Sequence, residues 1–456
     1  MTIKPPAAGA QNMRTFYIIW FGQLVSLLGS GLTGFAMGVY VYQETGSITS
    51  FAMSILAFTV PGVLFSPIAG ALVDRFPRRW MMILSDFGAG LTTIAILALF
   101  LSGSLEIWHI YVANFVASLF GTFQWPAYSA ATTMLVPQEQ LGRASGMVQM
   151  ADAISQLAAP AIAGALFLTW GIPNIIMIDI LTFLFAVGTL LYVRIPEPVR
   201  TEQEAATKPS IMSSVRTGFS YIRQRPGLFQ LLMYFAGINL FFTMLQPLWT
   251  PLLLDLGTPA QAGLVGSIVG AGMLVGTFVM SAWGGPKQRV LGVLGTGLWM
   301  GVILIFLLLP ASMTLIAVTG FFSMLVLPIM NGSSQALWQS KTEPDLQGRV
   351  FSVRRMLAQF TAPIAILLSG PLVDRVFGPA LMPGGVLADT LIGQLVGVGP
   401  GRGMALFFAV IGLLVLVITV IALGSPRLRK VQDEIPDVIV KSQSEEDSLK
   451  EALGSS

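Results

Sequence analysis

A carboxylate inside a long apolar run is the residue of this sequence best placed to do chemistry. Asp152 follows Arg143 by nine residues, about 13 Å along a helix. A charge at that depth in a membrane costs about 2.5–3.5 kcal/mol, so such residues usually face a wet cavity and have a function. Polar and small side chains share its helical face within an arc of about 80°: Ser145, Gln149, Gln156, Pro160 and Ala163. We therefore expect Asp152 to couple proton or cation movement to function; the alternative is a structural bond to a neighbouring helix.

Four other acids are expected to be structural or hydrated. Asp86 follows Arg79 by seven residues, which is two turns along one helical face, and could neutralise that arginine. Asp179 lies within another apolar run and is expected to be structural. Glu44 and Asp255 fall near the ends of apolar runs, where water can hydrate them.

The remaining reactive side chains are too few for an enzyme, which needs a convergent set of His, Asp or Cys residues. The chain has one histidine and no cysteine, so thiolate metal sites are excluded, and we expect no metal and no cofactor. His109 follows Trp108, and a position in an interfacial aromatic belt explains it. No G-x-x-x-x-G-K-[ST] loop occurs, so direct drive by ATP is not expected.

The composition indicates the elements that must position these residues. The chain has 456 residues, of which 54% are hydrophobic and only 10% charged, whereas a soluble domain carries roughly 25% charged residues. No charge occurs between Arg14 and Glu44 or from Val290 to Ser340. Runs of about 20 apolar residues can cross a bilayer as helices. We predict an all-α polytopic membrane protein with twelve spans: 15–43, 48–73, 80–102, 107–134, 143–169, 173–194, 228–254, 260–283, 289–309, 312–337, 350–374 and 403–423.

The basic residues predict which side each loop occupies. With the N-terminus inside, 23 of the 25 Lys and Arg residues fall on the inner side, and only Arg375 and Arg402 fall outside. This bias is typical of cytoplasmic loops. Both termini are therefore expected to be cytoplasmic, in the plasma membrane of a prokaryote.

A polar break divides the spans into two groups of six. Within it, Ile211, Val215, Phe219 and Ile222 repeat at helical spacing, which is typical of an amphipathic helix lying on a membrane. The predicted parts are an N-terminal segment, a six-helix bundle, a cytoplasmic linker, a second bundle and a disordered tail: 1–14, 15–194, 195–227, 228–423 and 424–456.

The two groups also resemble each other. "LGRASGMVQMADAISQLAAP" (141–160) aligns with "QGRVFSVRRMLAQFTAP" (347–363), once a three-residue gap is allowed. Each copy has Gly-Arg entering a span and Ala-Pro well inside it. Internal repeats of this kind are typical of transporters, with the substrate site between the two halves.

The densest group of charges is "GALVDRFPRRW", which follows the second apolar run. It resembles the loop motif Gly-x-x-x-Asp-Arg-x-Gly-Arg-Arg of the major facilitator superfamily, with Pro77 in place of one glycine. "APAIAG" resembles the antiporter motif of the same superfamily. The stretch from "GRVFSVRRMLAQF" to "GRGMALFF" is similar to the macrolide-efflux and siderophore-export branch of its drug:proton antiporters.

The resemblance implies roles for both motifs. The first motif would form a gate in which Asp74 meets the start of span 11, and its residues are Gly70, Asp74, Arg75, Arg78 and Arg79. A carboxylate at a helix N-terminus gains about 0.3–1 kcal/mol. Its basic partners there would be Arg349, Arg354 or Arg355. Charges that merely set topology are the alternative. The second motif comprises Gln156, Ala159, Pro160, Ala163 and Gly164. An arginine that many drug antiporters carry in span 4 is absent from "NFVASLFG".

Together these patterns predict a proton-driven exporter of amphiphilic organic compounds that works by alternating access. Export of a siderophore or other metabolite is the alternative, and a transporter-like receptor is the alternative outside transport. We expect a monomer in the lipid bilayer, with protons and a small molecule as partners and no nucleic acid. Side chains that could line its cavity, or equally bond a neighbouring helix, are Gln23, Gln124, Trp125, Tyr128, Gln149, Asn239, Gln246, Asn331, Gln335, Trp338 and Gln359.

Overall fold

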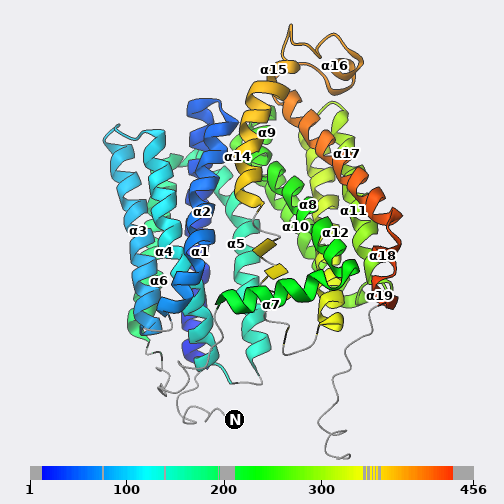
Figure 1. The fold of residues 1–456 in the computed structure, drawn as a ribbon. Helices are drawn as coiled ribbons and strands as arrows, with labels where there is room; N and C mark the ends of the chain where they lie inside the picture. The colour runs from blue at the N-terminus through cyan, green and yellow to red at the C-terminus, as the bar shows by residue number, and fades with distance from the viewer. Residues whose placement is uncertain are drawn as a thin grey trace, which may run out of the picture.

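The fold is described here from a computed structural model (Figure 1). The described residues are 13–73, 76–137, 140–193, 195, 211–342, 346, 350–351, 353–354, 356–357 and 361–434. Within them every regular element is a helix. Ten helical segments of the described chain are long and apolar enough to cross a membrane; of the twelve predicted spans, 107–134 and 350–374 are not among these ten.

Six long helices precede the polar break and lie close to the predicted spans. They pack against one another, with α1 contacting α6, α5, α2 and α4, and α3 contacting α4 and α6. Their bounds are α1 Met13–Thr45, α2 Ile48–Val73, α3 Arg78–Leu101, α4 Ile107–Leu135, α5 Leu141–Thr169 and α6 Gly171–Tyr192. We call this group the first half.

The helices after the break form the second half. The predicted span 228–254 is interrupted by a 3-10 turn, because Pro247 cannot donate the backbone hydrogen bond that an α-helix needs there. The elements are α8 Pro226–Leu245, η3 Gln246–Leu248, α9 Trp249–Leu256, α10 Pro259–Trp283, α11 Arg289–Ile305, η4 Phe306–Leu308, α12 Met313–Lys341, α14 Ala362–Leu372, the π-helix η5 Val373–Phe377, α15 Gly378–Ala380, α16 Leu391–Val396, α17 Arg402–Gly424, α18 Pro426–Arg429 and α19 Val431–Glu434.

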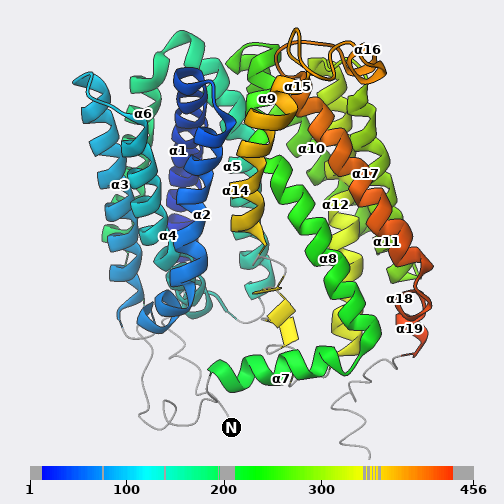
Figure 2. The same ribbon diagram turned by 45° about the horizontal axis from the view of Figure 1, so that its top comes forward.

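The predicted amphipathic segment is α7, Ile211–Arg223. It lies across one end of the helix bundle, and α16 lies at the opposite end (Figure 2). We call these ends the α7 face and the α16 face. The Tyr221 hydroxyl donates to the Lys341 carbonyl at 2.7 Å, and the Arg225 guanidinium stacks on the Tyr221 ring at 3.6 Å. The end of α7 is therefore attached to the end of α12.

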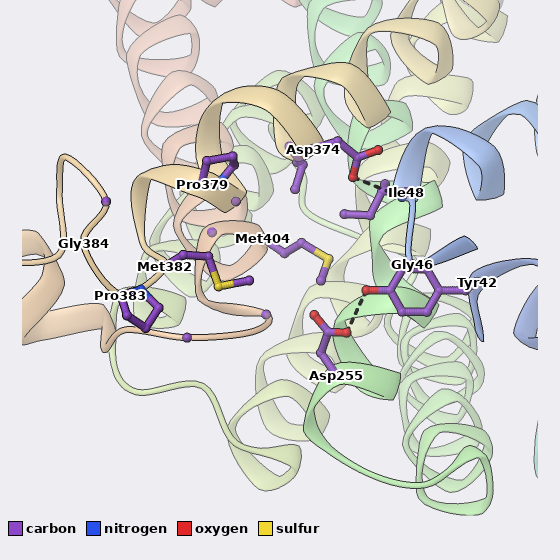
Figure 3. A pocket seen from close by; sticks show the side chains of 16 residues that line it. Tyr42, Gly46, Ile48, Asp255, Asp374, Pro379, Met382, Pro383, Gly384 and Met404 are labelled. Atoms are coloured by element: carbon purple, nitrogen blue, oxygen red, sulfur yellow. Dashed lines mark hydrogen bonds between the residues drawn. The ribbon is translucent and has the colours of Figure 1, made fainter. Parts of the chain in front are cut away.

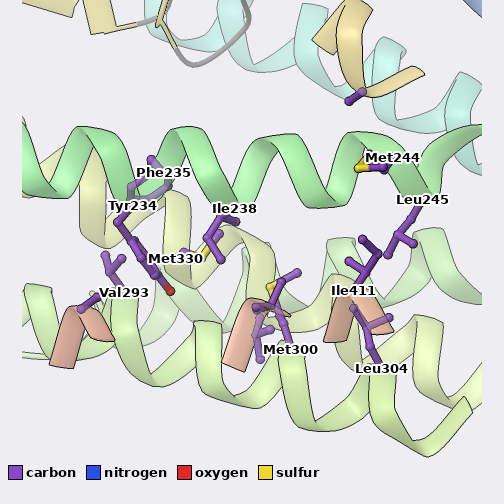
Figure 4. Close-up of a cluster of buried hydrophobic side chains, with 14 of the residues drawn as sticks. Tyr234, Phe235, Ile238, Met244, Leu245, Val293, Met300, Leu304, Met330 and Ile411 are labelled. Atoms are coloured by element: carbon purple, nitrogen blue, oxygen red, sulfur yellow. The ribbon is translucent and has the colours of Figure 1, made fainter. Parts of the chain in front are cut away.

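Each half has its own apolar core. In the second half, buried side chains of α8, α11, α12 and α17 form one cluster (Figure 4), where the Tyr234 hydroxyl lies 3.1 Å from that of Thr419. In the first half, smaller clusters join α1 to α3, α4, α5 and α6. Contact between the halves is made chiefly by α5 with α10 and by α2 with α14.

Candidate functional site

Asp152 lies in the interior of α5 and is half-buried. It is close enough to the Tyr128 hydroxyl of α4 to act on it electrostatically. That hydroxyl is itself buried and has no hydrogen-bond partner among the described residues. Because an unsatisfied buried hydroxyl costs about 1–3 kcal/mol, Tyr128 is a group that a water molecule or a ligand beside Asp152 would satisfy. Gln156, one turn further along α5, is exposed.

The predicted antiporter-like motif is divided between two faces of α5. Ala159 and Ala163 are buried in a cluster with Leu32 and Ala36 of α1. Pro160 and Gly164 instead meet α10 of the second half. Ala163 was expected to share the helical face of Asp152, but it does not line a cavity with it, because α1 covers that side of the helix.

The contact of α5 with α10 is a close approach of two backbones. A Cβ atom added to Gly164 would lie 2.5 Å from the Pro259 carbonyl oxygen, and one added to Gly263 would lie 2.1 Å from that of Pro160. Further along, the Ser267 hydroxyl donates to the Leu157 carbonyl at 2.6 Å. Small residues allow such approaches between membrane helices. These contacts hold the two halves together toward the α16 face.

Asp86 is surrounded by amides. Its carboxylate accepts hydrogen bonds from the Nε2 atoms of Gln23 and Gln124, both at 3.0 Å, and Gln124 also donates to the Oε1 atom of Gln23 at 2.9 Å. The expected partner, Arg79, donates instead to the carbonyls of Leu190 and Leu191 at the end of α6, at 2.8 and 2.6 Å. The prediction that Asp86 neutralises Arg79 is thus wrong. Gln23 and Gln124 join α1, α3 and α4, which is the alternative to their lining a cavity.

Asp179 of α6 is 4% exposed and accepts hydrogen bonds from Ser30 of α1 at 3.2 Å and Thr93 of α3 at 3.3 Å. Such bonds between helices agree with the structural role expected for this acid. His109 has local partners among the described residues: its Nδ1 atom accepts from the Glu106 amide at 3.0 Å, and its ring lies 3.8 Å from that of Trp108. These bonds cap the start of α4.

The predicted gate is described only in part. Gly70 lies in the last turn of α2, and Arg78 begins α3, whereas Asp74, Arg75, Arg349 and Arg355 lie outside the described residues. Arg354 is directed into the second half, where it donates to Gln335 at 2.9 Å and Ser334 at 3.1 Å. Its guanidinium also lies 5.4 Å from the Trp338 ring centre.

The other side chains that were expected to line the cavity differ in how exposed they are. Trp125 is 56% exposed. Gln246 and Asn331 are exposed as well, and Asn239 is half-buried. Trp338, by contrast, is fully buried. The side chain of Gln149 and the whole of Gln359 lie outside the described residues.

Two carboxylates line a cavity of about 440 Å³ between the halves at the α16 face (Figure 3). Asp255 of α9 accepts a hydrogen bond from the Tyr42 hydroxyl of α1 at 2.7 Å. Its expected role as a merely hydrated end residue is therefore wrong, although Glu44 is exposed as expected. Asp374 of η5 binds the first turn of α2. Sequence reasoning missed Asp374; the hexapeptides Gly70–Arg75 and Gly370–Arg375, which differ at one position, could have identified it.

Known proteins resemble this chain over most of its length. Residues 19–366 match the family described as Major Facilitator Superfamily. Macrolide efflux protein A of Streptococcus pyogenes is 32% identical over 374 residues, 79% of this chain and 90% of that protein. Multidrug efflux pump Tap of Mycolicibacterium fortuitum is 26% identical over 78% of this chain and 88% of its own length.

Solved structures share the fold. A bacterial homolog of the human lysosomal transporter Spinster superposes with a TM-score of 0.66 over 93% of this chain and 97% of that chain, at 12% identity. A POT family transporter in complex with a thioalcohol-conjugated peptide superposes with a TM-score of 0.65 over 90% of this chain and 96% of its own. The chain therefore belongs to the major facilitator superfamily, and it is a membrane transporter rather than an enzyme.

Proposed function

We propose that this transporter exports amphiphilic organic compounds of the macrolide type, driven by proton influx. The observation that carries the proposal is the likeness to relatives named for macrolide and multidrug efflux over most of both chains. The α7 face is then cytoplasmic and the α16 face is outside, in agreement with the bias of Lys and Arg, and the membrane is a bacterial inner membrane.

Alternating access is supported by where the described contacts between halves lie. The bonds Tyr42–Asp255, Ser47–Asp374 and Ser267–Leu157 all join the halves between mid-height and the α16 face. This arrangement is the one expected of a transporter closed toward the outside. A cargo site between the halves would then be reached from the α7 face, where an exporter takes up its substrate.

Proton coupling is assigned to Asp152. Its half-buried carboxylate lies beside the unpartnered Tyr128 hydroxyl, so protonation or cargo binding would change the balance of charge within the first half. One proton crossing 100 mV releases about 2.3 kcal/mol. At about 1.4 kcal/mol per tenfold, this energy sustains a concentration ratio of about 40 for a neutral solute.

The test is macrolide accumulation in an efflux-deficient bacterium that expresses the chain. The parent should lower accumulation, and a protonophore should abolish the effect. Asp152→Asn should lose at least tenfold in export rate, because an amide cannot carry the proton. Glu44→Gln, the same change at an exposed residue, should export like the parent.

Two results would contradict the proposal separately. Export by Asp152→Asn at the parental rate would remove proton coupling from that residue. Unchanged accumulation of every macrolide, with the protein present in the membrane, would exclude the proposed substrate class.

A further inference from the structure

Asp374 of the second half caps a helix of the first half. Its carboxylate accepts hydrogen bonds from the backbone amides of Ile48 at 3.1 Å and Thr49 at 2.8 Å (Figure 3). It also accepts from the hydroxyls of Ser47 at 2.9 Å and Thr49 at 2.7 Å. The first amides of a helix have no partner within the helix and carry its positive dipole end. Asp374 thus satisfies the start of α2 with a charged acceptor from 326 residues away.

The backbone beside this cap is shaped for the contact. Gly370 of α14 packs so closely that an added Cβ atom would lie 2.6 Å from the Thr49 Cα atom. Any side chain at this position would push α14 away from α2. The Ser47 hydroxyl, besides donating to Asp374, accepts from the Ser50 amide at 3.2 Å, so α2 also has a cap of its own. The start of α2 can therefore persist when Asp374 withdraws.

The sequence around Asp374 repeats the motif at the opposite end of α2. Gly70-Ala-Leu-Val-Asp-Arg75 begins in the last turn of α2, and Gly370-Pro-Leu-Val-Asp-Arg375 spans the end of α14 and the start of η5. The helices α2 and α14 contact each other. Gly70 lies in the last turn of α2, toward the α7 face, and Gly370 lies in the last turn of α14, toward the α16 face (Figure 2), so each glycine lies at the end of a helix that borders the other half.

We infer that Asp374 is the residue that holds the α16 face shut during the transport cycle. While the halves meet at that face, its charge caps α2; when they separate, the four bonds are lost and α2 keeps only Ser47 as its cap. Asp374 therefore favours the outwardly closed state, and it does so as a counterpart to the gate expected at the other hexapeptide. The inference rests on the proposed alternating access but not on the proposed substrate or on proton coupling.

The test uses cysteine labelling, because the chain has no cysteine of its own. Ser267→Cys in α10 places one thiol on the contact between the halves, where the serine bonds Leu157. A membrane-impermeant maleimide is applied to the α16 face. Adding Asp374→Asn should raise the labelling rate about tenfold, a shift of about 1.4 kcal/mol, because the outwardly open state becomes more populated. Asp389→Asn removes an exposed carboxylate of the same face and should leave the rate unchanged.

A second thiol separates a gating role from general loosening of the fold. Gln156→Cys, exposed on α5, is labelled from the α7 face, and Asp374→Asn should slow its reaction as that side closes. Unchanged labelling of Ser267→Cys, or faster labelling at both positions, would overturn the inference. If Asp374→Asn does not reach the membrane, Ser47→Ala with Thr49→Val removes two of the four donors and should produce a smaller shift in the same directions. No transported compound is needed, so failure of macrolide export leaves this result unaffected.

Discussion

Asp86 is held by neutral amides, so the stability of its site depends on hydrogen bonds rather than on a salt bridge. Asp86→Ala leaves the amide of Gln23 without its acceptor and removes one of the two acceptors of Gln124, and an unsatisfied buried group costs about 1–3 kcal/mol. The melting temperature of the detergent-solubilised protein should fall by several degrees. Asp86→Asn keeps one acceptor oxygen, so its melting temperature should lie between those of the parent and Asp86→Ala. An unchanged melting temperature for Asp86→Ala would show that water replaces the carboxylate and that the cluster contributes little.

Single residues are also where sequence reasoning reached its limit. Gln23, Asp86 and Gln124 could each be recognised as a polar group in an apolar helix, but their mutual bonds depend on how α1, α3 and α4 are rotated against one another. Hydrophobic periodicity does not fix that rotation, because lipid-facing and core-facing sides of membrane helices are both apolar. The placement of Asp152 in the interior of α5 could be predicted, because it depends only on distance along one helix.

At the scale of elements, the contact between α5 and α10 depends on glycine at some positions and tolerates a larger residue at others. Gly263→Ala places a methyl group 2.1 Å from the Pro160 carbonyl oxygen, so the helices must separate. Gly266→Ala, one turn away, meets only the Pro160 Cβ atom at an ordinary 3.5 Å. We expect Gly263→Ala to speed labelling of Ser267→Cys from the α16 face severalfold, and Gly266→Ala to leave it near the parental rate. Equal rates for the two variants would show that the contact is loose enough to absorb a methyl group.

The elements themselves were largely predictable, because a run of about 20 apolar residues can satisfy its backbone in lipid only as a helix. The amphipathic repeat from Ile211 to Ile222 likewise located α7, which ends one residue later, at Arg223. The break at Pro247 and the π-helix at Val373–Phe377 were not anticipated. The length of an apolar run locates a span, but it does not report a local change of helical pitch such as the one at Pro247 or the one around Asp374 and Arg375.

For the whole molecule, the two halves must separate at the α16 face if cargo leaves there. Ser47 and Asp374 lie on opposite halves, with 2.9 Å between the serine hydroxyl and the carboxylate. Replacing both with cysteine and joining the two thiols with a short crosslinker that attaches to each of them through a disulfide bond should hold this face closed. Export should then stop and should return, on reduction, to the rate of the uncrosslinked double variant. Ser47→Cys alone offers no second thiol and should export equally with and without the reagent, since the parent has no cysteine. Continued export by the crosslinked protein would mean that cargo leaves without separation of α2 from η5, and the rocking of two halves would have to be abandoned for this chain.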